Sequence, residues 1–200
     1  ALPRPDLAKG FRAATLAAGA SEPAQRVARR LDAAKAAFAL GSFVEARGIL
    51  TVALEDDPEE GALPQVRFLL AASELLCGNR EGASLLGGPW PDNQQGAVQL
   101  WRGLYLAALG GRGTEASHLL ARDFGRLTSY PAAVRDTLLP VAAEAIGRYG
   151  SQDDVEALGD LPAGAPYELV NAFTQLRPGN RKGASSAIPK LARSKDPIVA

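Results

Sequence analysis

Side chains that commonly perform catalysis or bind metals are scarce in this chain. Its 200 residues contain one histidine, His118, and one cysteine, Cys77. Catalytic triads and most zinc sites need a histidine beside a defined second group, and a disulfide needs two cysteines. Ser117 precedes His118, but no G-x-S-x-G turn surrounds it. We interpret His118 as a structural helix residue and Cys77 as a buried, unreactive thiol. We therefore expect no metal site and no enzyme activity.

Two glycine-rich segments invite comparison with phosphate-binding loops. Residues 110–114 read GGRGT, and residues 179–185 read GNRKGAS. A phosphate-binding loop follows a strand and ends in Lys followed by Ser or Thr, so that backbone amides and the lysine surround the phosphates. Both segments here follow predicted helices and lack that ending. We interpret them as turns, and we expect no cofactor.

Two charged clusters stand out from the rest of the sequence. The first is acidic and spans residues 55–60, at the predicted end of a helix. It lacks the alternating ligands and the glycine turn of a calcium loop, so we interpret it as a solvated turn. The second is a basic stripe of Arg26, Arg29 and Arg30 on one predicted helix. We interpret this stripe as a solvated face, and the alternative is a docking patch for an acidic peptide.

Overall composition excludes several classes of partner. The hydrophobic fraction is 46%, the charged fraction is 22%, and 22 Lys and Arg balance 22 Asp and Glu. A nucleic-acid-binding domain or a polybasic membrane tether normally carries a basic excess. No run of about 18 apolar residues is present, so no segment is predicted to span a bilayer. We expect no nucleic acid and no direct insertion into a membrane.

The chain contains no methionine, even at position 1. We therefore expect residues 1–200 to be a single domain cut from a longer protein, by processing or by cloning. Abundant Ala, Gly and Arg are typical of a GC-rich bacterial genome. A single cysteine does not distinguish the periplasm from the cytoplasm, so both locations stay open.

Helical patterns dominate the chain, and no segment alternates apolar and polar residues over the length of a strand. Turn signals recur at intervals of about 30 to 40 residues, as in helical repeat proteins. They lie near Gly41, Gly78, Gly111, Gly150 and Gly179. The predicted helices span residues 6–18, 23–40, 43–56, 65–77, 81–86, 92–109, 114–124, 131–149, 152–158, 165–176 and 181–192.

Several residues are predicted to define the helix ends. Ser21 and Ser42 each precede a helix and can cap it, the latter in a capping box with Glu45. Pro58 prevents continuation of the helix over 43–56. Pro140 is expected to kink or divide the helix over 131–149.

Residues 31–58 carry the most specific pattern in the chain. They place small, aromatic and Pro residues at regular positions of a helical hairpin, namely Ala34, Phe43, Ala46, Ala53 and Pro58. Small side chains let two antiparallel helices approach closely, while larger ones fill the gaps. In these positions the segment resembles the tetratricopeptide repeat, and weaker copies surround Gly78 and Gly179. The resemblance implies an all-α fold, an α-α superhelix formed by a right-handed solenoid of about five degenerate helix-turn-helix repeats.

The same resemblance implies a non-enzymatic domain that binds another protein, with a peptide or helix held on a concave surface. The first helix of each pair would line that surface. Aromatic residues commonly dominate such interfaces. For Trp101 we favour a position in the core, and the alternative is a position on that surface. The candidate contact residues are Lys35, Phe38, Trp101, Tyr105, Asn171 and Gln175.

Two other functions remain open at this point. The chain could be a structural spacer or assembly domain of a larger bacterial envelope or motility complex, with self-association through its end helices. It could also be an enzyme built on a helical toroid, which would require a deep pocket with paired acids. The sequence offers no such pair beside a histidine or cysteine.

Overall fold

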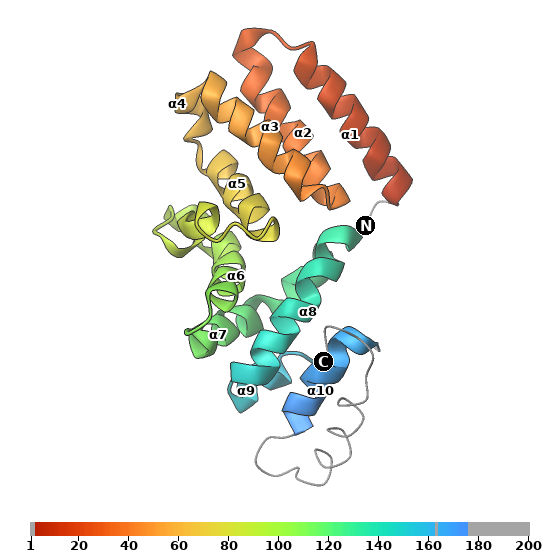
Figure 1. The fold of residues 1–200 in the computed structure, drawn as a ribbon, viewed down its shortest axis with the longest axis vertical. Coiled ribbons are helices and arrows are strands. Elements are labelled where there is room, and N and C mark those ends of the chain that lie inside the picture. The colour runs from red at the N-terminus through yellow and green to blue at the C-terminus, as the bar shows by residue number, and fades with distance from the viewer. Residues whose placement is uncertain (1–2, 163, 176–200) are drawn as a thin grey trace.

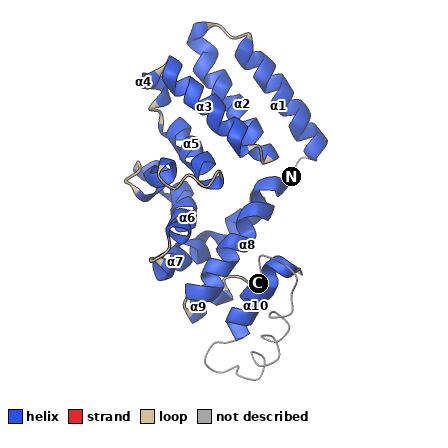
Figure 2. Cartoon of the chain, viewed as in Figure 1, coloured by secondary structure: helices blue, strands red, loops and turns tan. Residues whose placement is uncertain are grey.

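The structure is a computed structural model that describes residues 3–162 and 164–175, and these residues form helices, turns and loops without a strand (Figures 1 and 2). The predicted all-α class is therefore confirmed. The α-helices are α1 (Arg4–Gly19), α2 (Arg26–Leu40), α3 (Phe43–Asp56), α4 (Pro58–Gly61), α5 (Pro64–Leu76), α6 (Asp92–Leu109), α7 (Gly113–Asp123), α8 (Ala132–Tyr149), α9 (Gln152–Glu156) and α10 (Ala165–Gln175). The 3₁₀ segments are η1 (Pro23–Gln25), η2 (Gly82–Gly87) and η3 (Phe124–Ser129).

The first three helices form one end of the molecule (Figure 1). α2 packs against α1 on one side and against α3 on the other. Its buried apolar side chains recur at helical spacing, with Val27, Leu31 and Phe38 among them. Gly41 ends α2 with a φ of 84°, a left-handed conformation that glycine adopts without a steric penalty. The hairpin predicted from residues 31–58 is present.

The remaining elements follow in order along the molecule. α5 packs against α3 and η2, η2 packs against α6, and α6 and α7 form the next antiparallel pair. α8 packs against α7 and α10, and it also reaches α2, far away in the sequence (Figure 1). Consecutive elements therefore pack as helical pairs in series, while a right-handed solenoid of about five repeats stays a prediction. The predicted helix over 181–192 and the turn at Gly179 lie outside the described residues.

Aromatic side chains from four parts of the chain meet in the core. Phe38 of α2 and Phe68 of α5 lie with their ring centroids 5.8 Å and 6.0 Å from the indole of Trp101 in α6. Tyr130, just before α8, lies 6.2 Å from the same indole at an interplanar angle of 82°. The pairs of Trp101 with Phe68 and Tyr130 are edge-to-face, and the pair with Phe38 is tilted at 56°. Aromatic pairs contribute about 0.5–1.5 kcal/mol each beyond the area they bury. This aromatic cluster joins the first helices of successive pairs.

Some predicted helix ends differ from the structure. Ser42 precedes α3 but makes no side-chain capping bond, so the predicted capping box with Glu45 is wrong. Ser21 donates its hydroxyl to the carbonyl of Ala18, 2.8 Å away, and so it binds the end of α1 instead of capping the next helix. α8 continues through Pro140 and is not divided there. Which side chain caps a helix depends on the hydrogen bonds that it can form at that turn. The spacing of residue types in the sequence does not determine this.

Candidate functional site

A groove runs over α2 between α1 and α3. Because these two helices both pack against α2, the groove has α2 as its floor and one helix as each wall. Its cavity volume is about 560 Å³, within the range of binding sites in proteins. The residues that line it are Thr15, Ala18 and Gly19 from α1, Arg26, Arg30 and Ala33 from α2, and Gly48, Ile49 and Val52 from α3.

Small residues explain why the groove is hollow. Ala18 and Gly19 on one wall and Gly48 on the other leave room where larger side chains would close the gap. A Cβ added at Gly48 would meet no atom within 4 Å. Val52 keeps 45% of its surface exposed, so the wall it belongs to presents apolar surface to solvent. The groove thus has the shape and the apolar character of a docking surface.

The two arginines at the floor of the groove have different surroundings. Arg30 forms an ion pair of 2.5 Å with Asp56 and also donates to the carbonyl of Val52 at 3.3 Å. Arg26 is partly buried, yet its guanidinium makes no ion pair or hydrogen bond with any residue in the part of the chain that the structure describes. A partly exposed arginine commonly buries its aliphatic stem and keeps its guanidinium accessible. Arg26 is therefore available for an incoming anion.

The structure places half of the predicted contact residues in the core. The exposed fractions of Phe38, Trp101 and Tyr105 are 8%, 1% and 9%. Phe38 and Trp101 contact each other in the aromatic cluster, and Tyr105 lies against Gly87. These side chains offer a partner almost no surface in this conformation, so we correct the assignment of Phe38 and Tyr105 from groove to core, and Trp101 lies in the core as favoured. The physical reason is that the first helices converge and fill the space between them with their own aromatic rings.

Two of the other three predicted contact residues lie on the surface. Lys35 on α2 and Asn171 on α10 are exposed, and neither lines the groove between α1 and α3. Gln175 is the last residue of α10, and its side chain lies outside the described parts of the structure. The residues that sequence reasoning missed are the small ones at Ala18, Gly19 and Gly48. Gly48 lies inside α3, and a glycine inside a predicted helix was the available signal.

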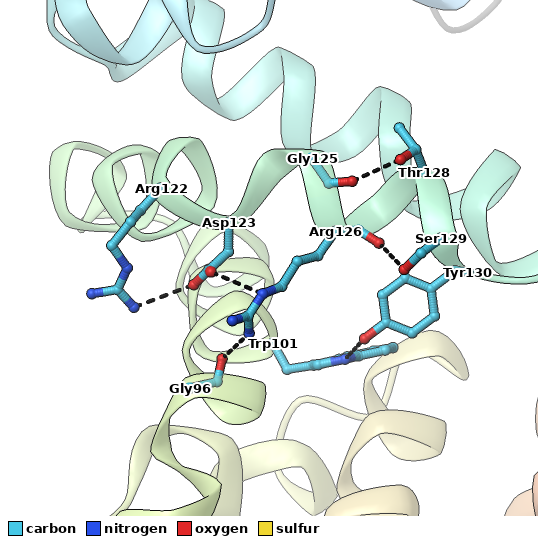
Figure 3. A network of polar contacts seen from close by, with 9 residues as sticks. All are labelled: Gly96, Trp101, Arg122, Asp123, Gly125, Arg126, Thr128, Ser129 and Tyr130. Carbon is cyan, nitrogen blue, oxygen red and sulfur yellow. Dashed lines mark hydrogen bonds and ion pairs between the residues drawn. The ribbon is translucent and has the colours of Figure 1, made fainter.

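A polar network beside the aromatic cluster holds η3 against α6 (Figure 3). The guanidinium of Arg126 donates to the carbonyl of Gly96 at 2.8 Å and pairs with Asp123 at 3.3 Å. The indole N–H of Trp101 donates to the hydroxyl of Tyr130 at 2.9 Å. Ser129 donates to the carbonyl of Arg126 at 2.7 Å within η3. These contacts satisfy polar groups at the ends of elements, and they position the core side chains.

His118 and Asp154 connect α7 to α9. The Nδ1 atom of His118 lies 3.2 Å from a carboxylate oxygen of Asp154, and the imidazole is otherwise largely exposed. Asp154 also forms a capping box with Ser151, whose backbone N–H donates to its carboxylate at 2.8 Å. Burial raises the pKa of Asp154, but the hydrogen bonds from Ser151 and His118 outweigh it, so the net pKa lies below its ordinary value. This contact connects two helices, in keeping with a structural histidine.

Cys77 follows α5 and is partly buried. Burial raises the pKa of its thiol, and the nearby cation of Arg47 only partly opposes this. The thiolate is the reactive form of cysteine, so a raised pKa favours the unreactive thiol at neutral pH. Among the residues that the structure describes, no group of three or more His, Cys, Asp or Glu side chains could hold a metal ion.

No helix within the described ranges has the length and apolar content to cross a membrane. The chain matches no family model, no curated protein and no solved structure. Its function is therefore inferred from the groove, the charges around it and the core.

Proposed function

We propose that this chain is a non-enzymatic protein-binding domain of the tetratricopeptide-like class, which holds a helix or peptide of a partner protein. The observation that supports this proposal is the groove between α1 and α3, with its apolar walls and its arginine without a counter-charge. Helix-in-groove binding uses an apolar surface of this kind between helices. The binding surface proposed here differs from the concave surface expected from the repeat pattern, because the aromatic cluster occupies the space between the first helices.

Affinity capture from native cells with a blocked groove tests this proposal. Gly48→Leu adds a large side chain at a residue that lines the groove, and nothing lies within 4 Å of the added Cβ. Gly10→Leu is the matched control, since Gly10 is equally unobstructed in α1 and does not line the groove. We expect the natural chain and Gly10→Leu to retain the same partner and Gly48→Leu to lose at least about nine-tenths of it, because a filled groove excludes the partner. Quantitative mass spectrometry measures the loss, and equal retention by the two variants would contradict the proposal.

One observation favours the alternative function as a spacer or assembly domain. α1 has no fully buried side chain, and Leu16 on this end helix is 75% exposed. An uncovered apolar end helix can pack against another subunit. In that case Leu16→Glu would abolish capture in the same experiment, while Gly48→Leu would leave it unchanged. The two variants therefore distinguish an end-to-end contact from a groove contact.

A further inference from the structure

We infer that the occupant of the groove is an acidic amphipathic helix of another protein, with one of its carboxylates paired with Arg26. This inference rests on the proposed function and specifies the chemistry of the partner. Its apolar face would lie against Ile49 and Val52, and its acidic side would face the floor at Arg26. A carboxylate and a guanidinium form strong, charge-assisted hydrogen bonds, most of all where water is partly excluded.

Arg26 selects the charge of the occupant. Arg30 is already paired with Asp56, whereas the guanidinium of Arg26 has no ionic or hydrogen-bonding partner in the described residues. Arg26 is also the first residue of α2, directly after the 3₁₀ segment η1. A carboxylate in the groove would give its guanidinium a counter-charge.

The charge of the groove lining supports the same choice. Two arginines, Arg26 and Arg30, line the groove, and none of its lining residues is acidic. Residues 4–56, which span all three helices of the groove, contain eight Lys and Arg and six Asp and Glu, a net charge of +2. A positive surface accelerates the approach of an acidic partner and disfavours a basic one.

The shape and lining of the groove favour a helix over an extended peptide. A peptide that adds as a strand needs the edge of a sheet, and the described ranges contain no sheet. A polyproline peptide needs an aromatic groove, and none of the lining residues is aromatic. Small residues on both walls admit the ridges of another helix.

The charge of the chain's own C-terminal segment excludes it as the occupant. Residues 176–200 contain six Lys and Arg and one Asp, which gives a net charge of +5. Such a segment would be repelled by Arg26 and by the basic residues around it. A second copy of the chain could occupy the groove only with an acidic helix. Measuring the oligomeric state of the chain tests this alternative.

Peptides that differ only in charge test the inference. Each probe is an amphipathic helix of about 18 residues, or five turns, with the same Leu and Ala stripe and with Glu, Gln or Lys beside it. Fluorescence anisotropy with the full chain measures each dissociation constant. We expect the Glu peptide to bind at least about tenfold more tightly than the Gln peptide, and the Lys peptide to bind most weakly.

Variants of the chain assign the preference to Arg26. We expect Arg26→Gln to reduce the Glu-over-Gln preference to about twofold or less, because the paired cation is gone. Arg29→Gln is the matched control, since Arg29 is exposed on the same helix and does not line the groove, and it should keep most of the preference. Circular dichroism and thermal melting of each variant check that the fold is intact.

Each other outcome overturns the inference in a recognisable way. Equal binding of all three peptides, or no binding of any of them, contradicts an acidic occupant. If Gly48→Leu then weakens all three equally, the groove still binds helices, and the proposed function survives without the charge preference. If Gly48→Leu changes nothing, the groove itself is not the site. A dimer that Gly48→Leu dissociates, measured by light scattering, would identify a second copy as the occupant.

Discussion

Trp101 is the residue on which the aromatic cluster depends most. It is 1% exposed and contacts Phe38, Phe68 and Tyr130 from three other parts of the chain. Its position on an apolar helix face could be predicted from the sequence. Whether its indole points into the core or into a groove could not. Both a groove and a core were compatible with the pattern, because the arrangement of neighbouring helices decides which space the indole enters.

Removal of the hydrogen bond between Trp101 and Tyr130 is expected to destabilise the fold. Tyr130→Phe keeps the ring but leaves the indole N–H without its acceptor at 2.9 Å. The expected loss in the free energy of unfolding is about 1–2 kcal/mol. Urea unfolding followed by tryptophan fluorescence measures it. Tyr149→Phe is the control, since Tyr149 is 48% exposed, and equal stability of both variants would contradict the role of this bond.

Asp154 is expected to stabilise the fold above its unfolded pKa and to lose that contribution in acid. Its pKa is lower in the folded chain than its ordinary value of 3.8, so the stabilisation is complete above the ordinary value and falls as the pH decreases through the folded pKa. Asp154→Asn should therefore cost about 1 kcal/mol at pH 7. Urea unfolding between pH 7 and about pH 3 should show that the difference from the natural chain shrinks in acid. A difference independent of pH would contradict this.

The boundaries of most helices could be predicted from Gly and Pro. Gly41 and Gly78 occupy the left-handed region with φ of 84° and 80°, which explains why both end a helix where the sequence predicts. Caps were harder to predict, because Ser, Asp and Asn can bond to more than one backbone group. Ser42 makes no capping bond, whereas Ser151 and Asp154 form a capping box that the same pattern could have revealed.

Replacing either of two helical glycines, Gly48 or Gly103, by alanine is expected to change the stability of the fold in opposite directions. Gly48 in α3 has open space at its Cβ position, so Gly48→Ala should raise the free energy of unfolding by about 0.5–1 kcal/mol. A Cβ at Gly103 in α6 would lie 2.8 Å from Leu120 Cγ, and the buried contact cannot easily relax. Gly103→Ala should be less stable than Gly48→Ala by about 1–3 kcal/mol. Urea unfolding compares them, and the reverse order would contradict the packing described here.

The path of the whole chain explains why the groove was not foreseen. The repeat pattern predicts which helices pair, and α2 with α3 and α6 with α7 do so. It does not predict how α1 lies against α2, nor that α8 reaches back to α2. The first placement depends on the turn between two consecutive helices, and the second depends on packing between segments far apart in the sequence. They create the groove on one side of α2 and fill the space between the first helices with aromatic rings.

The central claim is that a partner protein occupies the groove between α1 and α3. Site-specific photocrosslinking in native cells tests it most directly, with a benzophenone amino acid in place of Val52 or of Val141. These residues are matched, because both are helical valines and their exposed fractions are 45% and 48%, but only Val52 lines the groove. We predict a discrete crosslinked protein from position 52, lost when Gly48→Leu is added, and none from position 141. Equal crosslinking at both positions, or an adduct at position 52 that Gly48→Leu leaves intact, would contradict the claim.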